Sequence, residues 1–401
     1  MSQTSSKSIF ALTALVLALG LFGCDRASVP SPAPAGTMRI VSSLPHKGYA
    51  AVQSKVIDQA IDLAVEQRSA TAGVWRVEHL ALDDSDDETG DWSPTKEAAN
   101  AQQAVSDSSV VAYIGPYNSG ATMVSLPITS RAGLLQASPS ATWPGLTQVG
   151  WNDGEPSMYF PTGQRNFVRM VPPDSVQADA AVHWALATNA THIAVLTDGS
   201  SYSIGLAQRF ESAARGHAEL AGDRIEISPP ALGRLRSELA SYNALFYGPS
   251  TVQNAVSVAK ELEGTNITIF ATDTALDPQL AANAQDAQNW HILSNNVDLG
   301  VDAAAQEFAR DFEAKYGAAP SHLAANAYDL TNLVLDGVTT SGDDRAAITK
   351  AVLATAGYQG ASGTVSFDAE TGDRTEWRVS AYRLLDGAFK LVETFAGPLS
   401  P

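Results

Sequence analysis

From Met38 onward, short apolar runs rich in β-branched residues alternate with longer alanine-rich stretches. The short runs have the pattern of strands buried on both faces, whereas the long stretches repeat apolar residues at helical spacing. Strand and helix in alternation predict an α/β fold with a parallel sheet covered on both sides. The predicted strands span Met38–Ser42, Trp75–Leu82, Val110–Ile114, Leu134–Gln136, His192–Thr197, Ala244–Tyr247, Ile267–Ala271 and His291–Ser294.

The stretches between these strands predict amphipathic helices. In the first of them, apolar residues from Val52 to Leu63 recur three or four positions apart and polar residues lie opposite. Before the second helix, Ser93 stands at a capping position and Pro94 at the first helical position. The predicted helices span Tyr49–Glu66, Pro94–Ser106, Ser203–Arg215, Val252–Leu262, Ala303–Tyr316 and Leu323–Val338.

The alternation is interrupted between Thr147 and Asn166, where Gly, Pro, Trp and Tyr residues predict an irregular loop over a surface or a cleft. A second set of strand and helix units begins at His192. We therefore expect two similar lobes in series, each with a doubly wound parallel sheet. Near the C-terminus, alternating apolar residues on both sides of Asp386-Gly387 predict a β-hairpin over 376–392.

The first residues have the pattern of an export signal. One positive charge, Lys7, precedes an apolar run from Ile9 to about Leu21, which is too short for a comfortable transmembrane helix. Cys24, the single cysteine, follows Leu-Phe-Gly and resembles the acylated cysteine of a bacterial lipobox. We therefore expect a lipoprotein signal peptide at 1–24, a flexible linker at 25–36, and anchoring to the outer face of the cytoplasmic membrane. The alternative is a simple export signal with a coincidental cysteine.

The charge balance excludes some partners. Asp and Glu number 43 against 25 Lys and Arg, and the formal net charge is -18. Such a surface repels nucleic acid phosphates and anionic lipid headgroups. The acidic run from Asp83 to Glu88 lacks the register of a calcium loop, so we expect a solvated loop there.

Catalytic patterns are missing from the sequence. No Gly-x-Ser-x-Gly or Ser-x-x-Lys pattern occurs in a fitting context, and the seven histidines include no His-x-x-x-His pair. His192 and His291 open predicted strands and are expected to be packed or capping residues. The sequence therefore favours a binding protein over an enzyme, without a metal or a cofactor.

Two segments predict a ligand crevice. In Tyr113–Ala121 a strand is followed by a glycine-bearing turn and by small polar residues that open a helix. A helix N-terminus offers free N–H groups to a carboxylate, and Ser119 adds a hydroxyl donor. Leu134–Thr142 repeats the arrangement, with Ser140 and Thr142 after the next strand. Two such ends at the carboxyl edge of a parallel sheet are typical of a ligand site.

The ordered set of motifs resembles the substrate-binding proteins of branched-chain amino-acid ABC transporters. The resemblance covers nearly the whole mature chain, and its order is more specific than any single motif. It implies the type I periplasmic-binding-protein fold, with one lobe of 37–171 and 297–362 and another of 172–296 and 363–401, joined by a three-crossing hinge. The matching blocks are Asp83–Glu97, Val110–Pro127, Gln136–Thr147, Asp198–Ala207 and Gly363–Asp373.

The resemblance also implies roles for individual residues. Ser119, Ser140 and Thr142 match positions that would hold the carboxylate and amino group of the ligand, partly through backbone atoms. Tyr202 matches an aromatic residue of the second lobe, and Asp273 falls near the acidic residue for the ligand ammonium, with Thr274 as the competing position. The expected ligand-binding residues are Ser119, Gly120, Ser140, Ala141, Thr142, Tyr202 and Asp273.

One departure leaves the ligand open. The family often carries an aromatic residue after Tyr247-Gly248, where this chain has Pro249-Ser250-Thr251, so a preference for leucine-like ligands is in doubt. Aromatic residues that could reline the pocket are Tyr117, Trp143, Trp151 and Tyr159. The expected function is capture of a small amino-acid-like ligand and its delivery to an ABC permease. The alternatives are a ligand-sensing module for a receptor and a binding protein for an amide or urea type solute.

Overall fold

The structure is a computed structural model that describes residues 35–401 apart from 221–223, 284–288, 296–298, 301 and 397–401. The expected signal peptide, Cys24 and nearly all of the expected linker lie outside the described residues. Among the described residues, no helix is both long enough and apolar enough to cross a membrane.

The first sheet is parallel except at one edge. Its strand order is β2-β3-β1-β4-β5-β6, and only β2 runs antiparallel to its neighbour. The strands are β1 (Thr37–Leu44), β2 (Thr71–Ala72), β3 (Trp75–Asp83), β4 (Val110–Ile114), β5 (Leu135–Ser138) and β6 (Phe167–Arg169).

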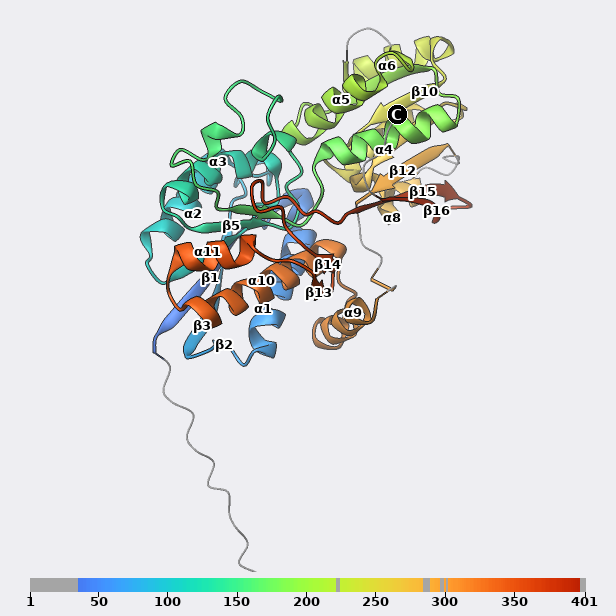
Figure 1. The fold of residues 1–401 in the computed structure, drawn as a ribbon. Helices are drawn as coiled ribbons and strands as arrows, with labels where there is room; N and C mark the ends of the chain where they lie inside the picture. Colours follow the sequence, from blue (N-terminus) through green and yellow to red (C-terminus); the bar gives the residue numbers. More distant parts are fainter. Residues whose placement is uncertain (1–34, 221–223, 284–288, 296–298, 301, 397–401) are drawn as a thin grey trace, which may run out of the picture. The chain divides into compact units, whose positions relative to one another are not determined.

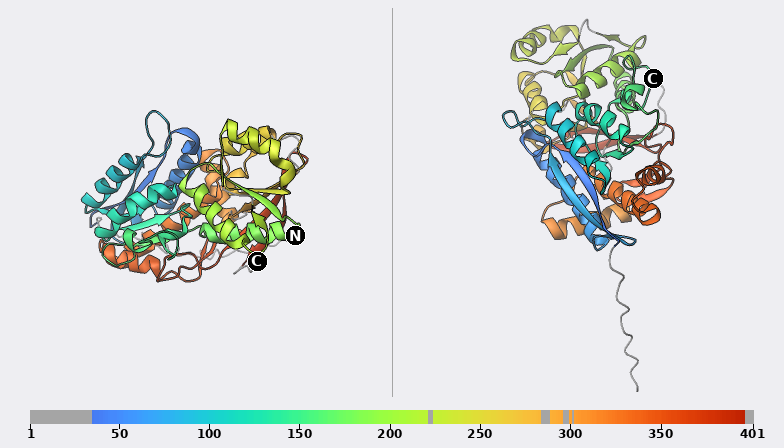
Figure 2. Two further views of the ribbon diagram at one scale, coloured as in Figure 1. Left: turned by 90° about the horizontal axis from the view of Figure 1, so that it is seen from above. Right: turned by 90° about the vertical axis from the view of Figure 1, so that its left-hand side faces the viewer.

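Helices cover both faces of this sheet, as Figures 1 and 2 show. On β1, Ile40 packs into the core beneath α1, α10 and α11, whereas the next residue, Val41, packs on the opposite face beneath α2. This alternation explains why the strand is apolar at successive positions. The helices are α1 (Ala51–Gln67), α2 (Pro94–Ser106), α3 (Ser119–Arg131), α9 (Ala303–Tyr316), α10 (His322–Ser341) and α11 (Arg345–Leu353).

The second sheet has the order β16-β15-β12-β11-β10-β7-β8, with β9 also paired to β7. Strands β7 to β12 pair in parallel, and the hairpin of β15 and β16 adds antiparallel strands at one edge. The strands are β7 (His192–Thr197), β8 (Glu219–Leu220), β9 (Ile225–Glu226), β10 (Ala244–Tyr247), β11 (Thr268–Thr272), β12 (Trp290–Ser294), β15 (Arg378–Leu385) and β16 (Ala388–Ala396).

The second sheet is also covered on both faces. Phe246 and Phe270 pack against α4 and α5, and the neighbouring Leu245 and Ile269 pack against α6, α7 and α8. The helices are α4 (Asp174–Ala187), α5 (Ser201–Ala214), α6 (Pro229–Glu238), α7 (Val252–Glu261) and α8 (Pro278–Asn283). A small separate hairpin consists of β13 (Tyr358–Gly360) and β14 (Gly363–Val365).

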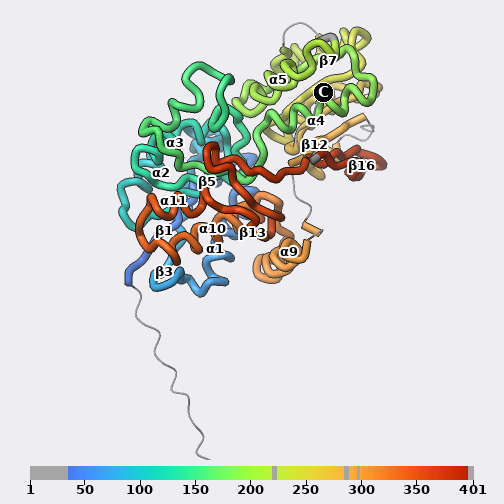
Figure 3. Tube along the Cα trace, in the orientation of Figure 1, coloured from blue at the N-terminus to red at the C-terminus, as the bar shows by residue number. Residues whose placement is uncertain are grey.

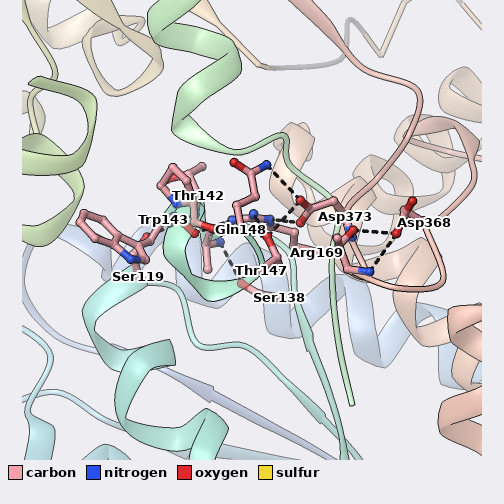
Figure 4. A network of polar contacts seen from close by, with 12 residues as sticks. Ser119, Ser138, Thr142, Trp143, Thr147, Gln148, Arg169, Asp368 and Asp373 are labelled. Carbon is pink, nitrogen blue, oxygen red and sulfur yellow. Dashed lines mark hydrogen bonds and ion pairs between the residues drawn. The ribbon is translucent and has the colours of Figure 1, made fainter. Parts of the chain in front are cut away.

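The chain passes between the two sheets three times, after β6, after β12 and after β14, and Figure 3 follows the last passage in red. A buried network, here called the Arg169 network, joins the first passage to the third (Figure 4). Arg169 Nε lies 2.7 Å from Asp373 Oδ1, and its other nitrogens donate to the Trp143 carbonyl at 2.7 Å and to Thr147 Oγ1 at 2.5 Å. Asp373 Oδ2 accepts from Thr147 and from Gln148.

A second contact ties the third passage to the helices of the first sheet. Asp329 on α10 accepts hydrogen bonds from the backbone N–H groups of Ala361 and Ser362, at 2.8 and 2.7 Å. Arg374 then donates to the Ser362 and Thr364 carbonyls, both at 2.7 Å. Burial raises the pKa of Asp329 to about 6, and these donors oppose the shift by stabilising its charged form.

Most elements agree with the sequence-based predictions, and all eight predicted strands and six predicted helices are present within a few residues of their expected bounds. The hairpin turned at Asp386-Gly387 is confirmed. Two local expectations were wrong. Ser93 occupies the N-cap of α2 without a capping side-chain hydrogen bond. After β5 the chain enters a single 3-10 turn, Pro144–Leu146, and not a second helix N-terminus.

The acidic run from Asp83 to Glu88 is solvated only in part. Asp87 and Glu88 are exposed, as expected, but Asp84 is 0 % exposed and neither of its carboxyl oxygens has a hydrogen-bond partner. Burial raises the pKa of Asp84 to about 7, and the charge of Asp83 adds to the shift. The expectation of a wholly solvated loop was therefore wrong, because the strand end carries Asp84 beneath the surface.

Candidate functional site

A cavity of about 770 Å³ is lined by residues from the carboxyl ends of strands in both sheets. Such edges are where open α/β sheets place their ligands. From the first-sheet side come the segments after β1, β3, β4 and β5, together with the start of α10. From the second-sheet side come the segments that follow β7, β10 and β11. The main lining segments are 117–120, 198–202, 250–254 and 273–277.

The N-terminus of α3 opens into this cavity. Gly115, at the turn before it, has φ +124°, and a Cβ there would lie 2.6 Å from the Ser43 carbonyl oxygen, so the close approach of β1 requires glycine. The Ser119 hydroxyl oxygen accepts from the backbone N–H groups of Thr142 and Trp143, both at 3.2 Å. Its own proton is free to point into the cavity, beside the first-turn amides of the helix.

Residues 140–142, which follow β5, differ in what they contribute to the cavity. The Ser140 hydroxyl donates to the Tyr117 carbonyl at 2.8 Å, which leaves its oxygen as an acceptor toward the cavity. Ala141 is buried, donates its N–H to Ser138 Oγ at 2.9 Å and is not among the described residues that line the cavity. Thr142 lines the cavity, and its buried hydroxyl oxygen has no hydrogen-bond partner.

Tyr202 and Asp273 meet on the second-sheet side. The Tyr202 hydroxyl lies 2.6 Å from Asp273 Oδ1 and 2.9 Å from Thr272 Oγ1. Desolvation raises the pKa of Asp273, and the hydrogen bond from Tyr202 opposes that shift. Thr274 also lines the cavity, and its backbone N–H donates to Asp273 Oδ1 at 3.2 Å. Both competing positions therefore face the cavity, but only Asp273 brings a carboxylate.

A buried carboxyl group lies behind these residues. Asp174 opens α4, is 0 % exposed, and donates its backbone N–H to the Thr142 carbonyl at 2.9 Å. Neither of its side-chain oxygens has a hydrogen-bond partner. Burial raises the pKa of Asp174 to about 8, although the nearby Thr142 hydroxyl and the charge of Arg169 oppose the shift. At neutral pH this group is therefore mainly protonated, and it adds little negative charge behind the cavity.

The cavity is also lined by residues that the sequence analysis did not select. The Asn118 side-chain amide donates to the Tyr49 hydroxyl at 2.8 Å, whereas its buried Oδ1 has no partner. The buried Gln53 Oε1 is likewise unpartnered. Trp92 covers the start of α3 so closely that a Cβ on Gly120 would lie 2.6 Å from the indole ring.

Asp198, Asp91 and His322 line the same cavity. Asp198 Oδ2 accepts from the Ser250 N–H at 2.7 Å and the Asn254 amide at 3.1 Å, which anchors the segment after β10. Asp91 lines the cavity as well and is exposed. Desolvation lowers the pKa of His322 to about 3, so this ring is neutral. The described residues that line the cavity include no Lys or Arg.

The aromatic relining expected from the sequence is correct for one residue. Tyr117 lines the cavity. Trp143, Trp151 and Tyr159 instead pack around Leu126 in a separate core cluster. There Glu155 accepts hydrogen bonds from the Trp143 indole at 3.0 Å and the Tyr159 hydroxyl at 2.6 Å.

Six of the seven expected ligand residues thus come together at one cavity, and Ala141 does not. Tyr49, Gln53 and Trp92 were missed. A signal for them existed, because they follow the carboxyl ends of β1 and β3 at the same sheet edge as Ser119. Within the described part of the chain, no group of three or more His, Cys, Asp or Glu residues is placed to hold a metal ion.

Comparisons with known proteins agree with this architecture. A model of the periplasmic binding protein family matches residues 37–384. The Leu/Ile/Val-binding protein BraC3 of Rhizobium johnstonii is 24% identical over 348 residues, which cover 84% of this chain and 89% of that protein.

Solved structures give the same result for the fold. The leucine-binding protein LivK of Thermotoga maritima superposes with a TM-score of 0.75 at 22% identity, covering 89% of this chain and 98% of that one. LivJ of Streptococcus pneumoniae, a branched-chain amino acid transporter substrate-binding protein solved with isoleucine, has a TM-score of 0.73 at 23% identity and covers 90% and 100%.

These findings confirm the resemblance and the type I α/β fold predicted from the sequence. They also confirm the expectation of a solute-binding protein rather than an enzyme. The match begins at β1 and ends within β15, so it includes the strands of both sheets up to the final hairpin. The chain belongs to the periplasmic binding protein family.

Proposed function

We propose that the protein captures an amino acid in the cavity and delivers it to an ABC permease. The observation that carries the proposal is the complementary chemistry at one end of the cavity. Donors at Ser119 and Thr142 lie on the first-sheet side, and the Asp273 carboxylate lies on the second-sheet side. A zwitterion that leaves water needs donors for its carboxylate and an acceptor for its ammonium group.

In this proposal the ligand carboxylate lies at the N-terminus of α3. It accepts from the Ser119 hydroxyl, the Thr142 hydroxyl and the first-turn amides, including that of Gly120. Ser140 donates its proton to the Tyr117 carbonyl, so it is left to accept from the ligand amino group. The N–H of Ala141 is already bonded to Ser138, and we give this residue no ligand contact.

The ligand ammonium lies against Asp273. An ammonium ion beside this carboxylate would favour its charged form and reverse the effect of desolvation on its pKa. Tyr202 orients the carboxylate through its hydroxyl and provides an aromatic surface beside the ligand. Asp273, and not Thr274, is therefore the proposed ammonium partner.

We further propose that residues 37–171 with 297–362, and 172–296 with 363–401, form two lobes that close on the ligand. Support comes from the three passages of the chain between the sheets and from the contribution of both sides to the cavity. A ligand that contacts both lobes binds the closed form more tightly and shifts the population toward it. The permease would then distinguish the loaded protein from the empty one.

The proposed location is the outer face of the cytoplasmic membrane, with Cys24 acylated after removal of the signal peptide and 25–36 as linker. Family membership supports a location outside the cytoplasm. Cell fractionation tests the anchor. The natural chain should be found with membranes, and Cys24→Ser should move to the soluble fraction of the same compartment. A Cys24→Ser variant that stays with the membranes would contradict acylation at this residue.

The test of the function is ligand binding by the purified protein. The chain from residue 35 onward is unfolded and refolded to remove bound ligand, and thermal unfolding is then measured against amino acids, amides and urea. A ligand at about a hundred times its Kd should stabilise the protein by about 2.7 kcal/mol. Stabilisation by at least one free amino acid supports the proposal, whereas stabilisation only by amides or urea, or by no compound, contradicts it.

A further inference from the structure

The lining of the cavity contains two chemically different groups of residues. The Asp273 end, made of Ser119, Thr142, Tyr202 and Asp273, offers both donors and an acceptor. The second group, here called the Gln53 end, consists of Tyr49, Gln53, Asp91, Asn118 and Asp198. Desolvation raises the pKa of Tyr49, and the charges of Asp91 and Asp198 raise it further.

The Gln53 end presents acceptors that lack donors. Gln53 Oε1 and Asn118 Oδ1 are both buried, and neither has a hydrogen-bond partner. Buried carbonyl oxygens of this kind cost free energy unless a donor reaches them. An aliphatic ligand side chain has no hydrogen-bond donor, so both oxygens would remain without a partner.

The charge around the cavity points in the same direction. Asp91, Asp198, Asp273 and Asp277 line it, His322 is neutral, and no Lys or Arg belongs to its described lining. The whole chain adds a formal charge of -18, which attracts cations over a longer range. The Tyr49 and Trp92 rings line the same region, and aromatic faces attract cations.

We propose that the ligand is a basic amino acid, whose side-chain guanidinium or ammonium group lies at the Gln53 end. The proposal rests on the amino-acid function proposed above and specifies its ligand. The side-chain N–H groups would donate to Gln53 Oε1 and Asn118 Oδ1, and their positive charge would face Asp91 and Asp198. The ligand carboxylate and α-ammonium group would occupy the Asp273 end.

Calorimetric titration of the refolded protein tests this choice with five probes: arginine, lysine, citrulline, leucine and spermidine. Arginine or lysine should bind at least about tenfold more tightly than leucine, as expected for hydrogen bonds to a charged group. Arginine should also exceed citrulline, which keeps the N–H donors but lacks the charge. Added salt should weaken arginine binding more than leucine binding, because dissolved ions screen the attraction between a cationic side chain and the acidic lining.

Each other result has a definite meaning. Leucine binding more tightly than arginine and lysine would overturn the inference and leave the proposed amino-acid function intact. If citrulline bound as tightly as arginine, the positive charge of the ligand side chain would have no role in binding. If spermidine bound and no amino acid did, both the inference and the proposed function would be overturned, because spermidine has no carboxylate to place at the N-terminus of α3.

Substitutions at the Gln53 end make the test specific. Gln53→Met removes one unpartnered acceptor and Asp91→Asn removes one charge, and each should weaken arginine binding by roughly tenfold. The matched controls are Gln102→Met on the exposed surface of α2 and Asp87→Asn, which bonds Lys47 and Lys96 outside the cavity lining. As a second variant, Gln53→Glu should strengthen arginine binding. Unchanged arginine affinity in all three cavity variants, with normal thermal unfolding, would overturn the inference.

Discussion

The Arg169 network and the ligand cavity are both built from polar side chains at the same sheet edge, but they differ in how those groups are paired. In the network, Arg169 is 0 % exposed, and each of its nitrogens finds an oxygen of Asp373, Thr147 or a backbone carbonyl (Figure 4). In the cavity, Thr142, Asn118 and Gln53 each keep a buried oxygen without a partner.

The paired groups of the network support the fold, whereas the unpaired groups of the cavity can recognise a ligand. A buried charge whose partners are all present holds the surrounding residues in one arrangement. If one partner is removed, the remaining charge is buried without compensation, which is unfavourable. A buried polar atom without a partner costs stability and is a position where a ligand can make a new hydrogen bond. The two regions meet at residues 141–143, where Arg169 donates to the Trp143 carbonyl and the neighbouring Thr142 faces the cavity.

The largest expected effect is on folding. Arg169→Met should lower the free energy of unfolding by about 3 to 5 kcal/mol, because Asp373 is then left without its charged partner. Chemical denaturation measures this change. Arg76→Met is the matched control, since the Arg76 side chain is 62% exposed and its contact with Glu78 is 3.6 Å long. A loss no larger than that of the control would show that the network does not support the fold.

The next effect is on binding. Thr142→Val keeps the shape of the side chain and removes the unpartnered hydroxyl, so it should weaken amino-acid binding by about 1 to 3 kcal/mol. Its free energy of unfolding should change less than its binding free energy, because the Thr142 hydroxyl has no hydrogen bond of ordinary geometry to lose, although it lies near the Asp174 carboxyl. Thr340→Val, on the exposed end of α10, is the control. Titration calorimetry and denaturation of both variants decide the matter, and normal affinity in Thr142→Val would remove this residue from the site.

The smallest effect is a pH dependence of stability. Asp174 has its pKa raised to about 8 by burial, so the folded protein keeps a proton that the unfolded chain loses near pH 4. The free energy of unfolding should therefore fall as the pH rises from about 6.5 to about 8, by at most roughly 1.4 kcal/mol per pH unit for this group. Desolvation lowers the pKa of His291 and of His322, so the folded protein favours their neutral forms. The stability that these two rings contribute therefore rises with pH only up to about 6.5, the pKa of a histidine in the unfolded chain. Above that pH they no longer oppose the trend.

The variant Asp174→Asn measures how much this carboxyl group contributes to the pH dependence of stability. The variant should show a shallower decline over the same pH range, and Asp84→Asn, which removes the carboxyl with a pKa raised to about 7, should flatten the lower part. Denaturation curves at several pH values supply the comparison. A slope unchanged in Asp174→Asn would mean that this carboxyl is already ionised in the folded protein.

Much of the fold was predictable because strand burial leaves a strong pattern. The strands His192–Thr197 and Ala244–Tyr247 were predicted at their observed bounds, since their residues are almost all buried between two helix layers. By contrast, α4 was missed. It buries Ala178, Ala181 and Trp184 and has little polar face, so helical periodicity is weak.

The site was predictable where it follows the order of the chain. Ser119 and Thr142 come directly after neighbouring parallel strands, and that position alone brings them together. His322 begins α10, some two hundred residues after Ser119, so only the folded structure brings it to the cavity. Burial of Asp174 and the missing partner of Asn118 depend on packing, which no local pattern records.

The central claim is that polar groups of the cavity, among them the unpartnered Thr142 hydroxyl and the Asp273 carboxylate, bind the two charged ends of an amino acid. A crystal structure of the refolded protein with bound arginine tests it most directly. The account predicts the ligand carboxylate within hydrogen-bonding distance of Thr142 Oγ1 and the first amides of α3, with its α-ammonium group against Asp273. A ligand carboxylate elsewhere, or a ligand that leaves Thr142 and Asp273 untouched, would contradict the account.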